Sequence, residues 1–518
     1  MHYVLLTSRL DADHGGLTAS LLRKARILHQ QAKITPVIAT FHDAVEFEQV
    51  AREIRDRYAL DESIRLINLN HHYRALVAKH RTGLPVDEVL AIACTDLPRY
   101  ETKTAYDAAG APYACTVSVE GQPVRRFYQC PDGTVYQCRS LIPAGEAPSW
   151  RVDGTSYGSG GFSSVGGMTV GALPDSAHQV VLEPGTTQEQ RFQTMDGFRR
   201  HFINELTRPP VTYLVGEARL LDKALLTLEN RFARKILVFH SVHLRPDGST
   251  IRTGNRFALK HLNRLDALVV LTQAQKADIV QRFGAAERIH VIPHAIVPPG
   301  PPQFDQRIPG KVVMATRLSP EKNVASAIRA FSSVRRAHPE AHLEVWGNGP
   351  KESELKTLIN QLGLADAVRL AGYTNQMEPI FRQAECSLLT SRWEGFPLAL
   401  METMAAGTPC LAFDIKYGPA DMIRPGVDGF LVPPGDEPAL ARQLIDYLGL
   451  SAAAKQELST SAWERMQCFS EERLAQRWQE LFAALIRPVA ARPPLLKRLW
   501  RRVPVGLRER LGQLFVTA

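Results

Sequence analysis

The amino-acid sequence predicts an α/β protein with two doubly wound, Rossmann-like domains and a β-rich insertion in the first domain. In two separate parts of the chain, short apolar runs alternate with helical stretches, as in parallel sheets covered by helices. Between about residues 93 and 207 this rhythm changes to short alternating runs separated by turns. The Pro/Gly-rich segment Pro298–Pro302 then separates the two α/β parts. With 518 residues, the chain also exceeds a single hydrophobic core.

The first domain is expected to combine residues 1–92 and 208–300. A loop containing Gly15 and Gly16 should follow its first strand, before a helix at about Thr18–Gln31. Strands are expected at the short apolar runs, Tyr3–Thr7, Thr35–Thr40, Ile64–Leu69, Thr212–Val215, Ile236–His240, Ala267–Leu271 and Ile289–Ile292.

Residues 93–207 are predicted to form the β-rich insertion. Two aromatic-rich runs flank Pro131–Gly133, where proline presets one backbone dihedral and glycine accepts a positive one. The Gly/Ser-rich stretch Gly154–Gly167 is predicted to be a loop.

The second domain is predicted to span residues 303–470. A helix at residues 471–490 should follow it and cross back to the first domain, and residues 491–518 form a tail. Strands are expected at Val312–Ala315, His342–Trp346, Val368–Leu370, Cys386–Thr390, Pro409–Ala412 and Phe430–Val432. Two such domains joined by one linker make a cleft, with ligands at the carboxyl ends of the strands.

Composition is that of an ordinary soluble globular protein, with 45% hydrophobic and 22% charged residues. No apolar stretch approaches the roughly 20 residues of a membrane span, and the N-terminus lacks the basic region of a signal peptide. The seven cysteines are odd in number and mostly scattered, which fits a reducing compartment. These features predict a cytoplasmic protein.

The net charge of +9 is concentrated in the tail, where eight basic residues and one acid follow Ile486. A nucleic-acid-binding enzyme would more often spread its positive charge over the folded body, so no nucleic-acid partner is expected. Leucines recur in the tail at three- and four-residue spacing, with arginines between them. This pattern predicts a basic amphipathic helix, interrupted near Pro504, for the inner face of an anionic membrane. A helix that packs back on the protein is the alternative.

The segment Glu394–Glu402 carries the most specific motif, two glutamates eight positions apart after a predicted strand. Pro397 suits the first turn of a helix, which puts Glu394 in the preceding loop and Glu402 inside the helix. The two carboxylates would stand roughly 10 Å apart, a fit for opposite ends of one nucleotide-sugar. Two solvated glutamates on a helix are the alternative. The amides that could bind an anion at the helix N-terminus belong to Gly395, Phe396 and Leu398.

Cations follow another predicted strand end, at Arg317 and Lys322. They could neutralise a diphosphate leaving group, as a metal ion does elsewhere, or they are isolated surface charges. The Gly15–Gly16 loop allows the backbone to approach a phosphate closely. His240, at a predicted strand end of the first domain, would point into the same cleft unless it is an ordinary core or surface histidine.

Together these motifs resemble the retaining GT-B glycosyltransferases of family 4, the E-x7-E enzymes. The resemblance rests on the spacing of Arg317 and Lys322, on Gly347–Pro350 and on the two glutamates. The chain is most similar to the subgroup that transfers α-linked glucose or N-acetylglucosamine to wall teichoic acids. That similarity rests on Asp414–Pro419 and on a β-rich insertion before His240–His243. Enzymes that glycosylate serine-rich surface proteins share the insertion.

The resemblance implies a role for each site residue. Glu402 would bind the ribose hydroxyls, Glu394 and the following residues Gly395–Leu398 would hold the sugar, and His240 would lie beside it. Arg317, Lys322 and the Gly15–Gly16 loop would bind the diphosphate. The implied reaction is front-face substitution with retention, with a UDP-sugar as substrate, no cofactor and no obligatory metal. Asp11 and Asp13 spell the D-x-D of metal-dependent transferases of another fold, but no metal role is expected for them.

The implied donors are UDP-glucose and UDP-N-acetylglucosamine, and the implied acceptor is a teichoic-acid-like polyol phosphate or a capsular glycan. One alternative is a glycosyltransferase of serine-rich surface proteins. Another is a non-catalytic, acceptor-binding partner subunit, although such a subunit would be expected to lose the donor residues that this chain retains. The related insertion can assemble subunits, so a homo-oligomer formed through the insertion is a further expectation. Pro293–Ala295 stands where many relatives carry Asn-Gly, which leaves the contacts near the linker open.

Overall fold

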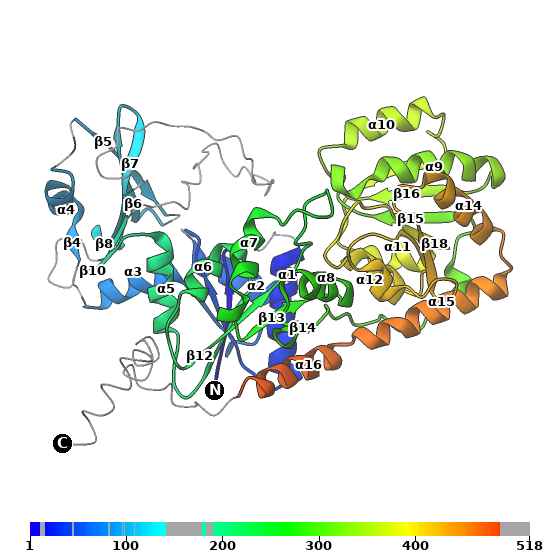
Figure 1. The fold of residues 1–518 in the computed structure, drawn as a ribbon. Helices are drawn as coiled ribbons and strands as arrows, with labels where there is room; N and C mark the ends of the chain where they lie inside the picture. The colour runs from blue at the N-terminus through cyan, green and yellow to red at the C-terminus, as the bar shows by residue number, and fades with distance from the viewer. Residues whose placement is uncertain are drawn as a thin grey trace, which may run out of the picture.

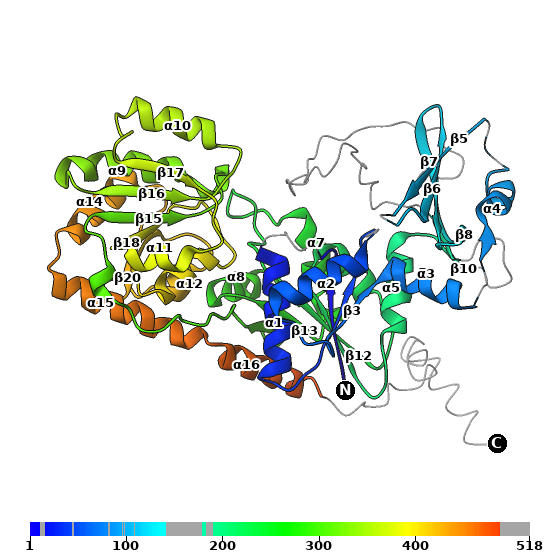
Figure 2. The same cartoon turned by 180° about the vertical axis from the view of Figure 1, so that it is seen from behind.

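The computed structural model describes residues 1–10, 16–43, 46–80, 83–95, 97, 99–107, 109–140, 179–182 and 190–486. Gly15, the stretch Gly154–Gly167 and the tail at residues 491–518 lie outside these residues. The described part contains two parallel sheets and one antiparallel sheet (Figures 1 and 2). This arrangement confirms the predicted fold class, α/β with a β insertion.

The first parallel sheet has seven strands in the order β14-β13-β12-β11-β1-β2-β3. The inner strands β11 and β13 are short runs buried on both faces, as expected of parallel strands covered by helices, whereas the edge strands β3 and β14 are only partly buried. Val4 and Leu6 face one core, and Leu5 faces the other. The strands are β1 (His2–Thr7), β2 (Val37–Thr40), β3 (Arg65–Asn68), β11 (Thr212–Gly216), β12 (Ala233–Val238), β13 (Ala267–Val270) and β14 (Ile289–Val291).

Helices cover both faces of this sheet. The core on one face includes residues of α1 (Gly16–Gln30) and α2 (Phe47–Tyr58). The core on the other face includes residues of α3 (Leu69–His80), α5 (Met195–Glu205), α6 (Asp222–Leu226), α7 (Thr253–Lys260) and α8 (Gln273–Phe283).

The antiparallel sheet has the order β10-β9-β8-β7-β6-β5, and β4 pairs with β8. One face packs against the first domain through Tyr113 and Tyr128, and the other forms a small separate core around Phe127. Its elements are β4 (Leu84–Pro85), α4 (Val86–Ala93), β5 (Glu101–Tyr106), β6 (Pro112–Val119), β7 (Gln122–Gln129), β8 (Thr134–Ser140), β9 (Gln179–Leu182) and β10 (Gln190–Phe192). The insertion sheet and the second domain lie on opposite sides of the first domain (Figure 1).

The second parallel sheet has six strands in the order β17-β16-β15-β18-β19-β20. The strands are β15 (Lys311–Ala315), β16 (His342–Trp346), β17 (Val368–Gly372), β18 (Cys386–Leu389), β19 (Cys410–Phe413) and β20 (Gly429–Val432). The helices are α9 (Val324–Ala337), α10 (Glu352–Gln361), α11 (Met377–Gln383), α12 (Leu398–Ala405), α13 (Pro419–Met422), α14 (Glu437–Leu448) and α15 (Ala452–Met466).

The helix α16 (Glu471–Ala484) returns from the second domain to the first (Figure 1). Trp478 and Phe482 are buried in the core that α1 also covers. The Tyr213 hydroxyl donates to the Phe482 carbonyl oxygen at 2.7 Å, and Glu471 pairs with Arg26 at 2.6 Å. These contacts fasten the end of the second domain to the first. None of the described helices is long and apolar enough to cross a membrane.

Candidate functional site

Glu394 lies in the loop between β18 and α12, at the carboxyl end of the second sheet. The helix begins at Leu398, so Pro397 precedes its first turn rather than occupying it. The Ser391 hydroxyl donates to the Glu394 carboxylate at 2.7 Å. The Glu394 backbone is held on both sides, because its N–H donates to Lys416 O at 3.2 Å and its carbonyl accepts from Tyr417 N at 2.7 Å.

Lys322 contacts Glu394 directly, with 2.5 Å between the ammonium nitrogen and Oε1. The Lys322 loop is fixed to the end of β18, since the Thr390 hydroxyl donates to the Asn323 carbonyl at 3.0 Å. The Arg392 N–H also donates to the carbonyl of the residue before Lys322, at 2.8 Å. The structure thus brings together a cation and a carboxylate that lie 72 residues apart in the sequence.

Arg317 is the exposed cation of this region, with a side chain 62% accessible. Its nearest carboxylate is that of Glu321, at 3.5 Å. The Arg317 loop is fixed by the turn after β16, because the Leu318 N–H donates to Asn348 O at 2.9 Å. Gly347 has φ +136°, and a Cβ there would overlap the Thr316 carbonyl. Arg317 is therefore held on a fixed loop with most of its side chain exposed.

His240 lies two residues beyond the end of β12 and forms a buried network with Glu217 and Lys24. His240 Nε2 and Lys24 Nζ each lie 2.6 Å from the Glu217 carboxylate. Burial alone would raise the pKa of Glu217, but Lys24 and His240 together lower it to about 2. Burial lowers the pKa of His240, although Glu217 opposes this shift. Glu217 is thus an anion that fixes the orientation of the His240 ring.

His294 connects this network to the second domain. Its ring stacks on His240, with centroids 5.6 Å apart, and meets Phe396 edge-on at 5.8 Å. Ser20 Oγ lies 2.9 Å from His294 Nδ1. Burial and the neighbouring His240 hold the pKa of His294 well below its ordinary value.

Gly395 marks the closest approach of the two domains at this site. A Cβ at this position would overlap the His240 carbonyl oxygen and the Ser241 Cα, both of them backbone atoms. Glycine is required here because the loop of the second domain lies directly against the end of β12. The Glu394 loop therefore lies directly against the backbone of His240 and Ser241.

Glu402 lies on α12, and its side chain is exposed. Nearby protein still displaces part of the water around its carboxyl group, which raises the pKa of that group. Arg23 of α1 opposes this shift. Gly16, the first residue of α1, begins the helix that carries Arg23.

The sequence did not single out Glu217 and Lys24. Glu217 is the first charged residue after the apolar strand β11, and this position could have flagged it. His294 was noted only as a departure from relatives. All seven cysteines are free thiols, and only Cys468 is exposed. Within the described ranges, no group of three or more His, Cys, Asp or Glu side chains could hold a metal ion.

Two Rossmann-like domains whose strand ends face each other define the GT-B fold of glycosyltransferases. Residues 306–462 match the family "Glycosyl transferases group 1". The second domain is therefore a group 1 glycosyltransferase domain, as the resemblance implied.

Solved structures share this fold over nearly the whole chain. TarM has a TM-score of 0.73 at 17% identity, covering 93% of this chain and 98% of that one. The pneumococcal O-GlcNAc transferase GtfA, in complex with UDP and GlcNAc, has a TM-score of 0.62 at 17% identity. That match covers 94% of this chain and 99% of GtfA.

Curated relatives match over shorter segments. The exopolysaccharide phosphotransferase of Streptomyces coelicolor is 40% identical over 227 residues, 43% of this chain and 24% of that protein. The poly(glycerol-phosphate) alpha-glucosyltransferase of Bacillus subtilis is 26% identical, over 52% of this chain and 40% of its own. The poly(ribitol-phosphate) alpha-N-acetylglucosaminyltransferase of Staphylococcus aureus is 25% identical, over 48% of this chain and 51% of its own. The matched segments thus span about half or less of these relatives.

Proposed function

We propose that this protein is a retaining glycosyltransferase that moves glucose or N-acetylglucosamine from a UDP-sugar, in α linkage, to a cell-surface polymer. The observation that carries the proposal is the contact of Lys322 with Glu394 in a group 1 domain, opposite His240 of the first domain. A polyol phosphate like teichoic acid, or a capsular glycan, is the acceptor. The names of the relatives from B. subtilis and S. aureus support this class of acceptor.

In the proposed donor site, Glu402 of α12 binds the ribose hydroxyls. Glu394 and the backbone of Gly395–Leu398 hold the sugar, and His240 lies beside it. Arg317 and Lys322 bind the diphosphate together with Gly15 and Gly16 of the predicted glycine loop. The rigid loops that carry Arg317 and Lys322 support this assignment, because preorganised cations stabilise charge that develops on a leaving group.

In the proposed reaction, the bond between the anomeric carbon and the UDP oxygen breaks, and UDP leaves with the electron pair. The acceptor oxygen attacks from the same face, so the configuration is retained. Its proton passes to the departing phosphate oxygen. Arg317 and Lys322 stabilise the negative charge on UDP, so the mechanism requires no cofactor and no obligatory metal.

A protein acceptor is the second candidate, favoured by one observation. The peptide N-acetylglucosaminyltransferase GtfA subunit of Streptococcus gordonii is 27% identical, over 49% of this chain and 53% of its own. The GtfA/B complex also shares the fold, with a TM-score of 0.66 at 18% identity. A non-catalytic partner subunit is less well supported, because the donor residues are present.

The proposed location is the cytoplasm, at the inner face of the cell membrane. The basic tail would provide the membrane contact, and the insertion offers a surface for self-association. Sedimentation of the purified protein alone tests self-association, and sedimentation with anionic vesicles tests the membrane contact.

Incubation with UDP-glucose, UDP-N-acetylglucosamine and UDP-galactose tests the proposed function. UDP release with one of the first two, increased by poly(glycerol phosphate) and unaffected by excess EDTA, is expected. No UDP release with any sugar nucleotide would refute it. Strict dependence on an added divalent cation would refute the metal-free mechanism.

A further inference from the structure

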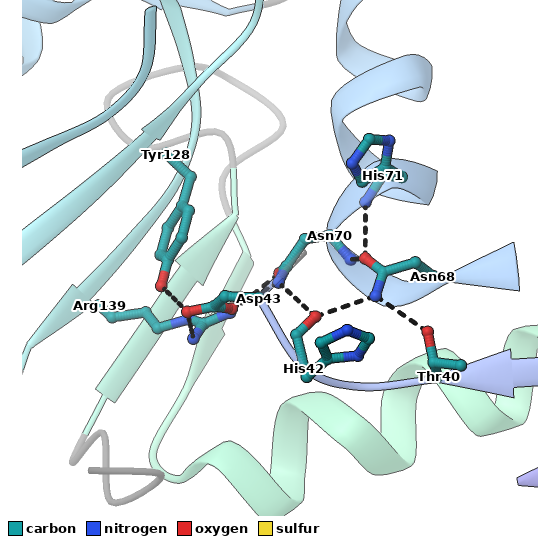
Figure 3. A network of polar contacts seen from close by, with 8 residues as sticks. All are labelled: Thr40, His42, Asp43, Asn68, Asn70, His71, Tyr128 and Arg139. Atoms are coloured by element: carbon teal, nitrogen blue, oxygen red, sulfur yellow. Dashed lines mark hydrogen bonds and ion pairs between the residues drawn. The ribbon is translucent and has the colours of Figure 1, made fainter. Parts of the chain in front are cut away.

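The insertion sheet meets the first domain at a polar network centred on Asp43 (Figure 3). Asp43 follows β2, and Arg139 of β8 contacts its carboxylate with both terminal nitrogens, at 2.9 and 3.1 Å. The Tyr128 hydroxyl donates to the same carboxylate at 2.5 Å, and the Asn70 amide at 2.6 Å. A carboxylate has about four positions for accepting hydrogen bonds, so Asp43 is fully engaged by these donors.

Among the described residues, Arg126 contacts no carboxylate directly beside this network, although its charge is attracted to Asp43 and helps to lower the pKa of that carboxyl group. It lies directly opposite Arg139 in the β7–β8 ladder and is 92% buried, with an exposed fraction of 8%. Its guanidinium lies 5.3 Å from the centre of the Tyr128 ring. Its Nε is buried without a hydrogen-bond partner, and within the described part of the chain Arg126 forms no ion pair.

The neighbouring arginine does not relieve this imbalance. Arg74 of α3 is also buried, and the carboxylate nearest to it is that of Asp107, at 3.6 Å. Three buried guanidinium groups therefore share two carboxylates. A buried charge that only shares a counter-ion is costly, so a protein that retains one at a junction gains something from it.

We propose that Arg126 binds an oxyanion of the acceptor polymer, and this inference rests on the proposed function. Arginine suits a phosphodiester, sulfate or carboxylate because its planar fork donates two parallel hydrogen bonds. Phosphodiesters of a polyol-phosphate chain and carboxylates of a capsular glycan share this chemistry. The junction is a second contact for the acceptor, separate from the donor site.

The position of the junction fits an extended acceptor. Asp43 follows β2, whereas His240 follows β12, and all strands of this sheet are parallel. Both residues thus lie at the carboxyl edge of one sheet, three strand spacings apart, which is roughly 15 Å. An acceptor that reaches both places must span several repeats, so Arg126 should affect polymers and not short acceptors.

The test compares wild-type protein with Arg126→Gln, Arg126→Lys and the control Lys103→Gln, which removes an exposed cation from β5 of the same sheet. Calorimetric titration with poly(glycerol phosphate), hyaluronan and neutral dextran separates phosphodiester, carboxylate and uncharged ligands. Arg126→Gln should weaken binding of at least one anionic polymer about ten-fold. Lys103→Gln should bind like wild type, and dextran should not distinguish the variants.

Thermal stability and UDP-sugar hydrolysis distinguish a ligand site from a structural role. Without polymer, Arg126→Gln should melt no lower than wild type, because it removes a buried charge that contacts no carboxylate directly. Unchanged polymer binding, or no binding of anionic polymers by wild type, would overturn the proposal. The proposal would also be overturned if Arg126→Gln both melts at a lower temperature and binds polymer more weakly, while Arg126→Lys shows neither change. If Arg126→Gln does not fold, Arg126→Lys is the test, and polymer affinity equal to that of wild type in this variant overturns the proposal. Arg126-dependent binding without UDP-sugar hydrolysis would refute the proposed function alone.

Discussion

Asp278 of the first domain accepts a hydrogen bond from the Tyr417 hydroxyl of the second domain at 2.6 Å. The same carboxylate oxygen lies 2.6 Å from Lys416 Nζ. Lys416 and Tyr417 are the residues whose backbones hold Glu394 on both sides. A side chain on α8 thus acts on the candidate donor site through the loop that fixes Glu394.

Replacement of Asp278 by Asn should therefore reduce transfer without touching a substrate. The neutral amide loses the charge attraction to Lys416, and the loop that orients Glu394 loosens. We expect kcat/KM for the UDP-sugar to fall about ten-fold, since small displacements of reacting groups are costly. Steady-state kinetics of UDP release measures this. Glu287→Gln removes an exposed carboxylate of the first domain and is the control. Equal kinetics for Asp278→Asn and the control would show that Asp278 does not act on Glu394 through the loop of Lys416 and Tyr417.

Lys322→Ala and Glu394→Ala should each lower kcat about 100- to 1000-fold and leave the fold intact. Each change removes one preorganised charge from the proposed donor site. UDP release at saturating donor is the measurement, and circular dichroism monitors the fold. Lys351→Ala, which removes a partly exposed lysine of the same domain, should behave like wild type. Near-normal kcat in either site variant would mean that the donor binds elsewhere.

Glu217→Gln should lower stability in a pH-dependent way. The folded-state pKa of Glu217 is about 2, below its ordinary value of 4.5. A lowered pKa stabilises the folded state above about pH 4.5, and this stabilisation is lost as the pH falls toward 2. Leaving Lys24 unpaired in the core should cost roughly 3 kcal/mol at neutral pH. Urea unfolding of wild type and variant, from neutral pH to about pH 3.5, measures the difference. If the difference in the free energy of unfolding between wild type and variant stays constant over this pH range, the Lys24–Glu217 ion pair does not stabilise the fold.

Much of this architecture could be predicted because it depends on local pattern. The apolar runs predicted the strands of both parallel sheets to within a few residues. The predicted strand Ile236–His240 ends earlier, at Val238, because pairing with β13 ends there. Lys322 and Glu394 were each expected at a strand end, but their direct contact was not predicted, because it depends on the adjacency of β15 and β18 in the sheet.

The ion pairs between distant segments could not be predicted in this way. Lys24 and Glu217 are 193 residues apart, and neither stands in a motif. Their pairing follows from the order of strands, which places β11 beside β1 and therefore beside α1. Arg126 and Arg139 look like ordinary alternating charges in a strand. Only the packing of the insertion on α3 shows that both are buried.

Removal of residues 494–518 should release the protein from anionic vesicles and leave transfer to a soluble acceptor largely unchanged. Residues 487–518 carry +7 of the net charge of +9, and all proposed donor residues precede Asp436. Each cation near an anionic surface contributes about 1 kcal/mol, so binding should weaken steeply with salt. Vesicle sedimentation measures this. If the truncated protein still sediments, or the intact protein never does, the tail has a structural role.

Gly395→Ala should separate the two domains at the donor site. The new Cβ would overlap the His240 carbonyl and the Ser241 Cα, which cannot move as a flexible side chain would. We expect UDP-sugar hydrolysis to fall at least about ten-fold, because His240 and the Glu394 loop move apart. The melting temperature should change little, since this contact lies between the hydrophobic cores. Gly254→Ala is the matched control, because a Cβ there meets only the Arg219 side chain at an ordinary 3.9 Å. Normal hydrolysis by Gly395→Ala would show that catalysis does not need this close approach.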